Sequence, residues 1–104
     1  MKITKENVSR HIINDRADRL AIIGATVGFG EEVLRERFNP LKDSWSCFMD
    51  SGAMLIWNHN KTKLVTGFVP TLDQVVWVYG RPVNKIIEKL VIQAQKKYQK
   101  RMGN

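Results

Sequence analysis

Cysteine and histidine are both scarce in this chain of 104 residues. Cys47 is the only cysteine, and the two histidines are His11 and His59. A single thiol excludes an internal disulfide framework and a zinc site built from several thiolates. Neither histidine has cysteines or suitably spaced carboxylates beside it. We therefore expect no metal and no cofactor, and we expect Cys47 to be a buried, unreactive thiol within the apolar run 45–49.

Long hydrophobic runs are also missing. No apolar stretch approaches the roughly 20 residues that a membrane-spanning helix needs, and residues 1–10, MKITKENVSR, lack the apolar core of a signal peptide. These absences lead us to expect a soluble, cytoplasmic protein that does not enter a membrane.

Acidic residues are few relative to basic ones. Ten Asp and Glu stand against seventeen Lys and Arg, so the formal net charge is +7. In so small a chain this excess indicates an anionic partner, either nucleic acid or an acidic protein surface. The alternative is that the charge serves solubility alone.

The clearest structural signal is a β-meander between residues 45 and 69. Apolar runs at about 45–49, 53–58 and 63–69 alternate with Asp50-Ser51-Gly52 and with the polar tip NHNKTK, and both connections are typical of turns. Pro70 ends the last run because it cannot donate to a β-ladder. We therefore predict three antiparallel strands whose apolar faces are covered by helices.

Residues 1–38 are expected to be helical. Thr4 can cap a first helix, and apolar residues recur at helical spacing again over 17–24. We expect a short helix over 31–38 before Asn39-Pro40 breaks the pattern. Its inward-facing residues would be Val33, Leu34 and Phe38.

Helical patterns return after Pro70. Thr71 and Gln74 fit a capping box, and residues 72–79 predict a short helix ending at Gly80, although they are β-branched and aromatic enough to form a fourth strand. Pro82 then opens a long amphipathic helix over 82–101. We thus expect one α+β domain over residues 1–104, with N-terminal helices, a three- or four-stranded meander (45–69) and a long C-terminal helix. The apolar spacing of that last helix would also serve a homodimer.

Glycines at 24, 28 and 30 suggest a remote alternative, a dinucleotide-binding turn. Such a turn needs an apolar strand before the glycines and a helix N-terminus after them, so that the backbone can approach a pyrophosphate. A lone glycine motif is weak, and two carboxylates, Glu31 and Glu32, follow it. The simpler interpretation is that these glycines end one helix and start the next.

Metal-free RNA cleavage is the one chemistry that the remaining polar residues could support. It needs a proton acceptor, a proton donor and cations that hold phosphate. His11 and Tyr79 are the candidates for the first two roles, because an imidazole titrates near neutral pH. The candidate phosphate-binding residues are Arg16, Arg19, Lys61, Lys63, Lys96, Lys97, Lys100 and Arg101. The alternative for each is structural: a His11 bonded to a backbone carbonyl, and tip residues that are simply solvated.

Two segments resemble a known family in their layout. They are ITKENVSRHIINDRADRL, an Arg-rich helical stretch, and SGAMLIWNHNKTKLVTGFVPT, the predicted hairpin. Together, over residues 2–70, they are similar to small phage and mobile-element proteins of the RelE/BrnT-type toxin fold. The resemblance implies a ribonuclease, ribosome-dependent or free, that an antitoxin neutralises, and it favours RNA over DNA as the partner.

The sequence therefore supports three functional hypotheses. The first is a nucleic-acid-binding protein with the features of a ribonuclease toxin. The second is a phage-borne interaction module that inhibits a host or defence complex, and the third is dinucleotide binding. Trp57 and Trp77 bear on the first two. An exposed tryptophan beside cations can stack on a base or anchor a protein interface.

Overall fold

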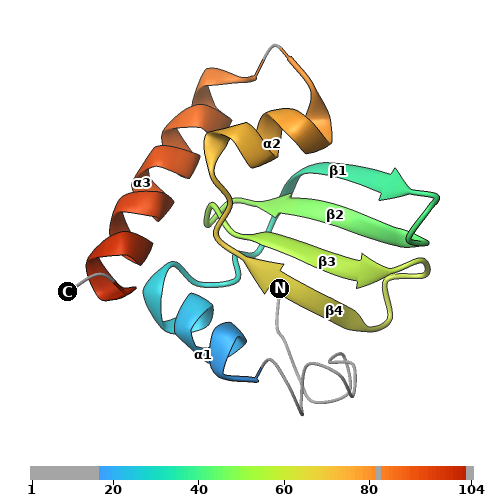
Figure 1. Ribbon diagram of the computed structural model, residues 1–104, viewed down its shortest axis with the longest axis horizontal. Coiled ribbons are helices and arrows are strands. Elements are labelled where there is room, and N and C mark those ends of the chain that lie inside the picture. Colours follow the sequence, from blue (N-terminus) through green and yellow to red (C-terminus); the bar gives the residue numbers. More distant parts are fainter. Residues whose placement is uncertain (1–16, 82, 103–104) are drawn as a thin grey trace.

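The computed structural model describes residues 17–81 and 83–102, with the backbone alone for 17–19 and 102. In these residues the order of elements is α1 (Ala17–Thr26), β1 (Val33–Asn39), β2 (Ser44–Met49), β3 (Met54–Asn58), β4 (Leu64–Phe68), α2 (Leu72–Tyr79) and α3 (Lys85–Met102). The strands form one sheet in the order β1-β2-β3-β4 (Figure 1). The α+β class is confirmed, whereas the helix expected at Thr4 lies outside the described residues.

The meander matches its predicted boundaries to within about one residue. β2 pairs antiparallel with β3, and β3 pairs antiparallel with β4. The β3–β4 register shifts between Ile56 and Trp57, because Ile56 pairs with Thr66 while Trp57 pairs with Leu64. Val65 is therefore the extra residue of a β-bulge. Gly52, in the β2–β3 turn, has a φ of 90°.

The helix expected over 31–38 is wrong, because this stretch forms strand β1. β1 pairs with β2 from Val33↔Met49 to Asn39↔Ser44, with an irregularity between Val33 and Arg35. A two-turn helix is marginal without strong packing, and a neighbouring strand offers the same backbone groups a full ladder. The sheet thus gains its fourth strand at the N-terminal edge. The three residues expected to pack inward are instead exposed: Val33 by 41%, Leu34 by 37% and Phe38 by 36%.

Residues 72–79 are helical, which excludes the alternative fourth strand there. The capping box is complete: the Thr71 hydroxyl accepts from the Gln74 N–H at 3.2 Å, and the Gln74 side chain accepts from the Thr71 N–H at 2.8 Å. The helix ends at Gly80, whose N–H donates to the Val76 carbonyl at 2.7 Å. These bonds fix both ends of α2.

The last helix begins later than predicted. α3 starts at Lys85, because Asn84 supplies the cap: its side-chain oxygen accepts from the Ile86 N–H at 2.7 Å. Pro82 itself lies outside the described residues. α3 also packs tightly on the β2–β3 turn. A Cβ on Gly52 would lie 2.6 Å from the Ala94 Cβ, so only glycine allows this approach.

One face of the sheet carries rows of paired residues, two of which differ in how far the helices cover them. The covered row, Phe48–Met54–Phe68, packs against Val75 of α2 and against Ile87 and Val91 of α3. Two residues further along each strand lies the open row, Ser46–Ile56–Thr66. In Figure 1 the helices gather at one end of the strands, and the β1–β2 and β3–β4 turns project from the other. The two rows therefore lie at different distances from the helices.

The opposite face of the sheet packs against α1. Its buried cluster contains Leu20, Cys47, Met49, Leu55, Trp57 and Leu64. Gly67 on β4 allows α1 to approach, since a Cβ there would lie 3.2 Å from Leu20 and 3.0 Å from Leu55. Burial of Cys47 is confirmed at 1% exposure, and burial raises the pKa of its thiol. A thiol in this state is a weak nucleophile.

Candidate functional site

The outer side of α3 carries a row of lysines. The helix holds six Lys and Arg against a single Glu, so it contributes most of the chain's net charge. Its buried residues Ile87, Val91 and Ala94 face the core. On the other side lies what we call the lysine face: Lys85, Lys89, Lys96 and Lys100, all exposed. At 1.5 Å per residue this row is about 22 Å long.

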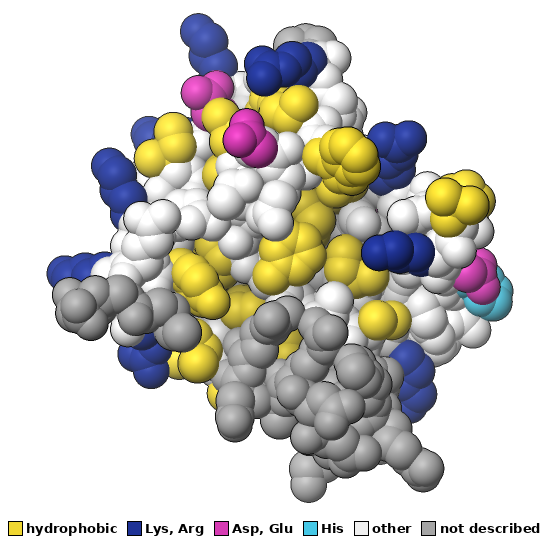
Figure 2. Space-filling view, viewed as in Figure 1, with side chains coloured by type: hydrophobic (Ala, Val, Ile, Leu, Met, Phe, Trp, Pro, Cys, Tyr) yellow, Lys and Arg dark blue, Asp and Glu magenta, His cyan; other side chains and the backbone are white. Residues whose placement is uncertain are grey.

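The remaining C-terminal cations extend this positive charge. Lys97 and Arg101 are also exposed. Lys100 and Arg101 lie in the last turn, where a cation interacts favourably with the negative end of the helix dipole. Figure 2 shows Lys and Arg side chains along the side of the molecule where α3 lies. Four of the predicted phosphate-binding residues thus share one helix.

The structure does not bring the other predicted cations to α3. Arg16, like His11, lies outside the described residues, and of Arg19 only the backbone in α1 is described. Lys61 and Lys63 belong to the β3–β4 turn, which projects from the end of the sheet away from α3 (Figure 1). The predicted phosphate-binding set is therefore divided between at least two surfaces.

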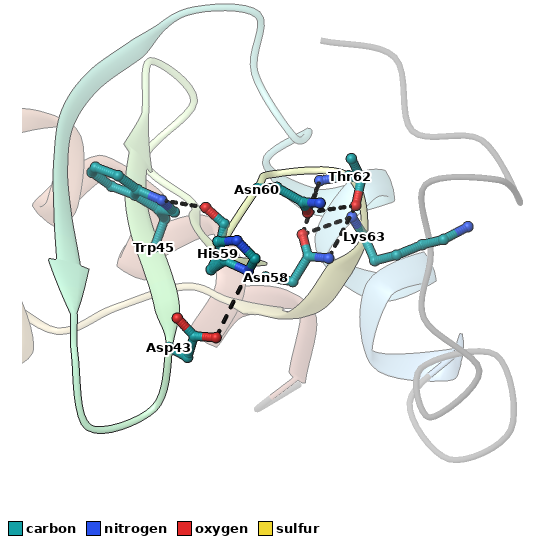
Figure 3. A network of polar contacts seen from close by, with 7 residues as sticks. All are labelled: Asp43, Trp45, Asn58, His59, Asn60, Thr62 and Lys63. Atoms are coloured by element: carbon teal, nitrogen blue, oxygen red, sulfur yellow. Dashed lines mark hydrogen bonds and ion pairs between the residues drawn. The ribbon is translucent and has the colours of Figure 1, made fainter.

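Hydrogen bonds give the β3–β4 turn a defined shape (Figure 3). The Asn58 side-chain oxygen accepts from the backbone N–H groups of Thr62 at 2.8 Å and Lys63 at 2.9 Å. The Trp45 indole N–H donates to the His59 carbonyl at 2.8 Å. The His59 imidazole lies 3.7 Å from the Asp43 carboxylate, and both side chains are exposed. Such an exposed pair is loosely held and contributes little stability.

Lys61 is engaged within the protein. Its ammonium pairs with the Glu36 carboxylate of β1 and lies 4.4 Å from the centre of the Trp45 ring. These contacts hold the turn against the sheet, and they accompany an unusual backbone, since the φ of Lys61 is 58°. Lys61 would have to leave Glu36 before it could bind a phosphate.

Tyr79, the predicted proton donor, has a structural contact. Its hydroxyl donates to the Ser46 carbonyl at 2.8 Å, beneath α2. Burial raises the pKa of the phenol above its usual value. A phenol with a raised pKa gives up its proton less readily. Because His11 is outside the described residues, pairing of the two remains a prediction, and the geometry of Tyr79 favours a role in holding α2 on the sheet.

A groove opens where the sheet extends beyond α2. It has a volume of ≈ 540 Å³, within the range of about 300–1,000 Å³ usual for ligand sites. Its floor includes the open row, and Trp77 and Val78 of α2 form one wall. A second hollow of ≈ 340 Å³ adjoins it, and the two share Asn39, Ser46, Trp77 and Val78. Figure 2 shows hydrophobic side chains gathered at the centre of this face with Lys and Arg around them.

Two exposed apolar side chains flank the groove and the hollow that adjoins it. Trp77 is 86% exposed and Leu41, in the β1–β2 turn, is 95% exposed. Trp57, by contrast, is buried at 5%. Of the two tryptophans singled out from the sequence, Trp77 alone is therefore available to a partner.

Arg37 of β1 connects the strand to the end of α2. Its guanidinium donates to the Val78 carbonyl at 2.6 Å, one of the carbonyls that a helix leaves unpaired at its C-terminus. Arg37 lines the adjoining hollow, so a positive charge is held at the edge of the groove. Lys42 lines the groove itself, and Asp43 is the acidic residue among the lining side chains.

The structure does not support the dinucleotide interpretation. Gly24 lies inside helix α1, and Gly28 and Gly30 lead into strand β1. A helix thus precedes the glycines and a strand follows them, the reverse of what a pyrophosphate-binding turn requires. In residues 17–81 and 83–102, no three His, Cys, Asp or Glu side chains gather as metal ligands. Nor does any helix in that part of the chain have the length and apolar character to cross a membrane.

Comparison of the chain with protein-family models, with curated proteins and with solved structures gave no significant match in any of the three. The interpretation of the surfaces described above therefore depends on their own chemistry.

The sequence does not identify Ser46 as a groove residue or Arg37 as a residue of the adjoining hollow. Arg37 falls in the stretch predicted as a helix, although the alternation of Arg35, Glu36 and Arg37 is also compatible with a strand. Ser46 was part of an apolar run, and its contribution depends on where α2 ends above the sheet. Lys85 and Lys89 were recognisable from their spacing with Lys96 and Lys100.

Proposed function

We propose that this protein binds nucleic acid, RNA in preference to DNA, through phosphate contacts made by the lysine face of α3. One observation carries the proposal: α3 presents Lys85, Lys89, Lys96 and Lys100 on the side opposite its buried residues. A core-facing helix needs polar residues on its outer side, but it does not need most of them to be cationic. The preference for RNA follows from the resemblance to RelE/BrnT-type toxins.

The spacing of the lysine face supports a polyanion rather than a single anion. Its lysines recur at intervals of four and seven residues, so neighbouring ammonium groups lie about 6 to 10 Å apart along the helix. A flexible phosphate backbone can contact such a row at several points and release a counterion at each. Four contacts predict that the logarithm of affinity falls with the logarithm of salt concentration with a slope near −3 for a single strand.

The test measures binding of a fluorescently labelled RNA, and of the same sequence in DNA, between ~50 and ~200 mM salt. Replacing Lys96 and Lys100 by Gln should weaken binding and flatten the salt slope by about 0.7 to 1 unit per lysine, because each lost charge removes one phosphate contact. Lys96→Arg, which keeps the charge, and Gln93→Ala, which trims the same helix without changing charge, should leave the slope as it is.

Absence of RNA and DNA binding by the unaltered protein at ~50 mM salt would reject the proposal. An unchanged slope in the Lys96→Gln, Lys100→Gln variant would reject the lysine face as the binding surface. A stoichiometric protein complex that survives nuclease treatment and depends on these lysines would support the alternative, an interaction module that binds an acidic protein surface.

A further inference from the structure

We infer that the groove between the open row of the sheet and α2 binds an unpaired nucleobase, with Trp77 stacking on its face. The inference rests on the proposed nucleic-acid binding, and it specifies that the partner is single-stranded. It concerns a surface separate from the lysine face of α3.

Packing of α2 does not account for Trp77. The residues that α2 turns toward the core include Leu72, Val75 and Tyr79, and Val75 is 1% exposed. Trp77 lies on the other side of the helix, 86% exposed, where tryptophan has a lower helix propensity than Lys, Arg, Gln or Glu. An exposed ring of this size costs solubility and contributes little to the fold. Its position is nevertheless well defined, because bonds at Thr71 and Gly80 fix both ends of the helix.

The groove beside Trp77 has a mainly apolar lining with polar groups set among it. Apolar surface comes from Met54, Ile56, Val65, Phe68 and Val78, while Ser44, Ser46 and Asn39 bring hydroxyl and amide groups. A nucleobase has this combination of surfaces, with a flat apolar face and an edge of hydrogen-bond donors and acceptors. An apolar peptide side chain in the same place would bury those hydroxyl and amide groups without offering them partners.

The positive charges at the edge of the groove are complementary to the sugar–phosphate backbone to which such a base is attached. Arg37 is held there by its bond to the Val78 carbonyl, which uses one of the five N–H donors of its guanidinium. Lys42 adds a second cation on the β1–β2 turn, and Asp43 opposes them with one negative charge beside His59. A base stacked on Trp77 would thus place its phosphate near a net positive charge.

Base stacking predicts a difference between single and double strands. A duplex keeps its bases stacked on one another, so Trp77 cannot reach them, whereas a single strand can insert one. The test therefore compares an unstructured RNA with a duplex of the same length. The variants are Trp77→Ala, Trp77→Phe and, as a control, Ile86→Ala, which removes a 67%-exposed apolar side chain from α3.

Trp77→Ala should weaken binding of the single strand about 5- to 150-fold and leave binding of the duplex unchanged. Trp77→Phe should retain most of the affinity, because a smaller ring still stacks, and Ile86→Ala should behave like the unaltered protein. Binding of the single strand should also quench the tryptophan fluorescence of the unaltered protein, and Trp77→Phe should remove that quenching.

Equal affinities of the unaltered protein and Trp77→Ala for the single strand would overturn the inference while leaving the proposed function intact. Equal losses for single strand and duplex would overturn it as well, because base stacking would not explain them. Loss of a protein complex in Trp77→Ala, with RNA affinity unchanged, would assign the groove to a protein partner. If the unaltered protein binds no nucleic acid, the proposed function fails and this inference fails with it.

Discussion

The covered row and the open row differ in chemistry although they lie two residues apart on the same three strands. Phe48 and Met54 of the covered row are 0% exposed beneath α2 and α3. Ser46 and Thr66 of the open row are polar and only partly buried, and they form part of the groove floor. A third row, Ser44 paired with Asn58, is polar throughout. One face of the sheet thus changes from buried core to the floor of a groove within about 7 Å.

This difference shows which part of the molecule is built for stability. Side chains under the helices are apolar and large, as a core requires. Those beyond the end of α2 include the polar Ser46 and Thr66 beside the apolar Ile56, a mixture that is typical of ligand pockets. Tyr79 lies at the boundary, where its hydroxyl bonds to the backbone of Ser46.

The largest expected effect is at the covered row. Phe48→Ala should destabilise the protein by about 3–5 kcal/mol, because it removes a fully buried ring and leaves a cavity beneath α2 and α3. Urea unfolding followed by circular dichroism measures the loss. A cost below about 1 kcal/mol would mean that this end of the sheet is not the dry core described here.

An intermediate effect is expected at the boundary. Tyr79→Phe should cost about 1 kcal/mol near neutral pH, because the Ser46 carbonyl loses its buried donor. Burial raises the pKa of Tyr79, so the folded protein keeps this proton when the unfolded chain, whose phenol titrates near pH 10, loses it. The stabilisation is therefore complete below about pH 10 and is lost as the pH rises further.

Unfolding curves of both proteins between neutral and alkaline pH provide the measurement. Above about pH 10 the unaltered protein should lose stability more steeply than Tyr79→Phe. Cys47 is present in both proteins, so its titration cancels in the comparison. Parallel curves would show that the Tyr79 hydroxyl has the same environment in the folded and unfolded states.

The smallest effect on stability is expected at the groove. Trp77→Ala should change the free energy of unfolding by no more than about 0.5 kcal/mol, since the side chain is 86% exposed and α2 keeps both of its caps. The same urea titration tests this expectation. A larger loss would show that Trp77 supports the fold, and a change in RNA affinity could then not be attributed to stacking.

Much of the fold was predictable because its signals are local. The turns at Asp50-Ser51-Gly52 and at 58–63, the capping box at Thr71 and the rhythm of the last helix each depend on a few neighbouring residues. Strand β1 was predicted incorrectly because its apolar spacing fits a helix, and its identity depends on pairing with β2. The cations of α3 were recognisable from the sequence, whereas the groove was not, because its residues come from four separate segments of the chain.

The sequence by itself determined the α+β class, the three-stranded core of the meander, the capping box at Thr71, the buried Cys47 and the concentration of positive charge in the last helix. Each follows from composition or from contacts between residues close in the chain. Only the tertiary structure decided that 33–39 is an edge strand, that Trp77 is exposed while Trp57 is buried, and that Lys61 is paired with Glu36. The physical reason is that burial and pairing depend on which elements meet, and α2 ends above the sheet at a point that leaves one row covered and the next one open.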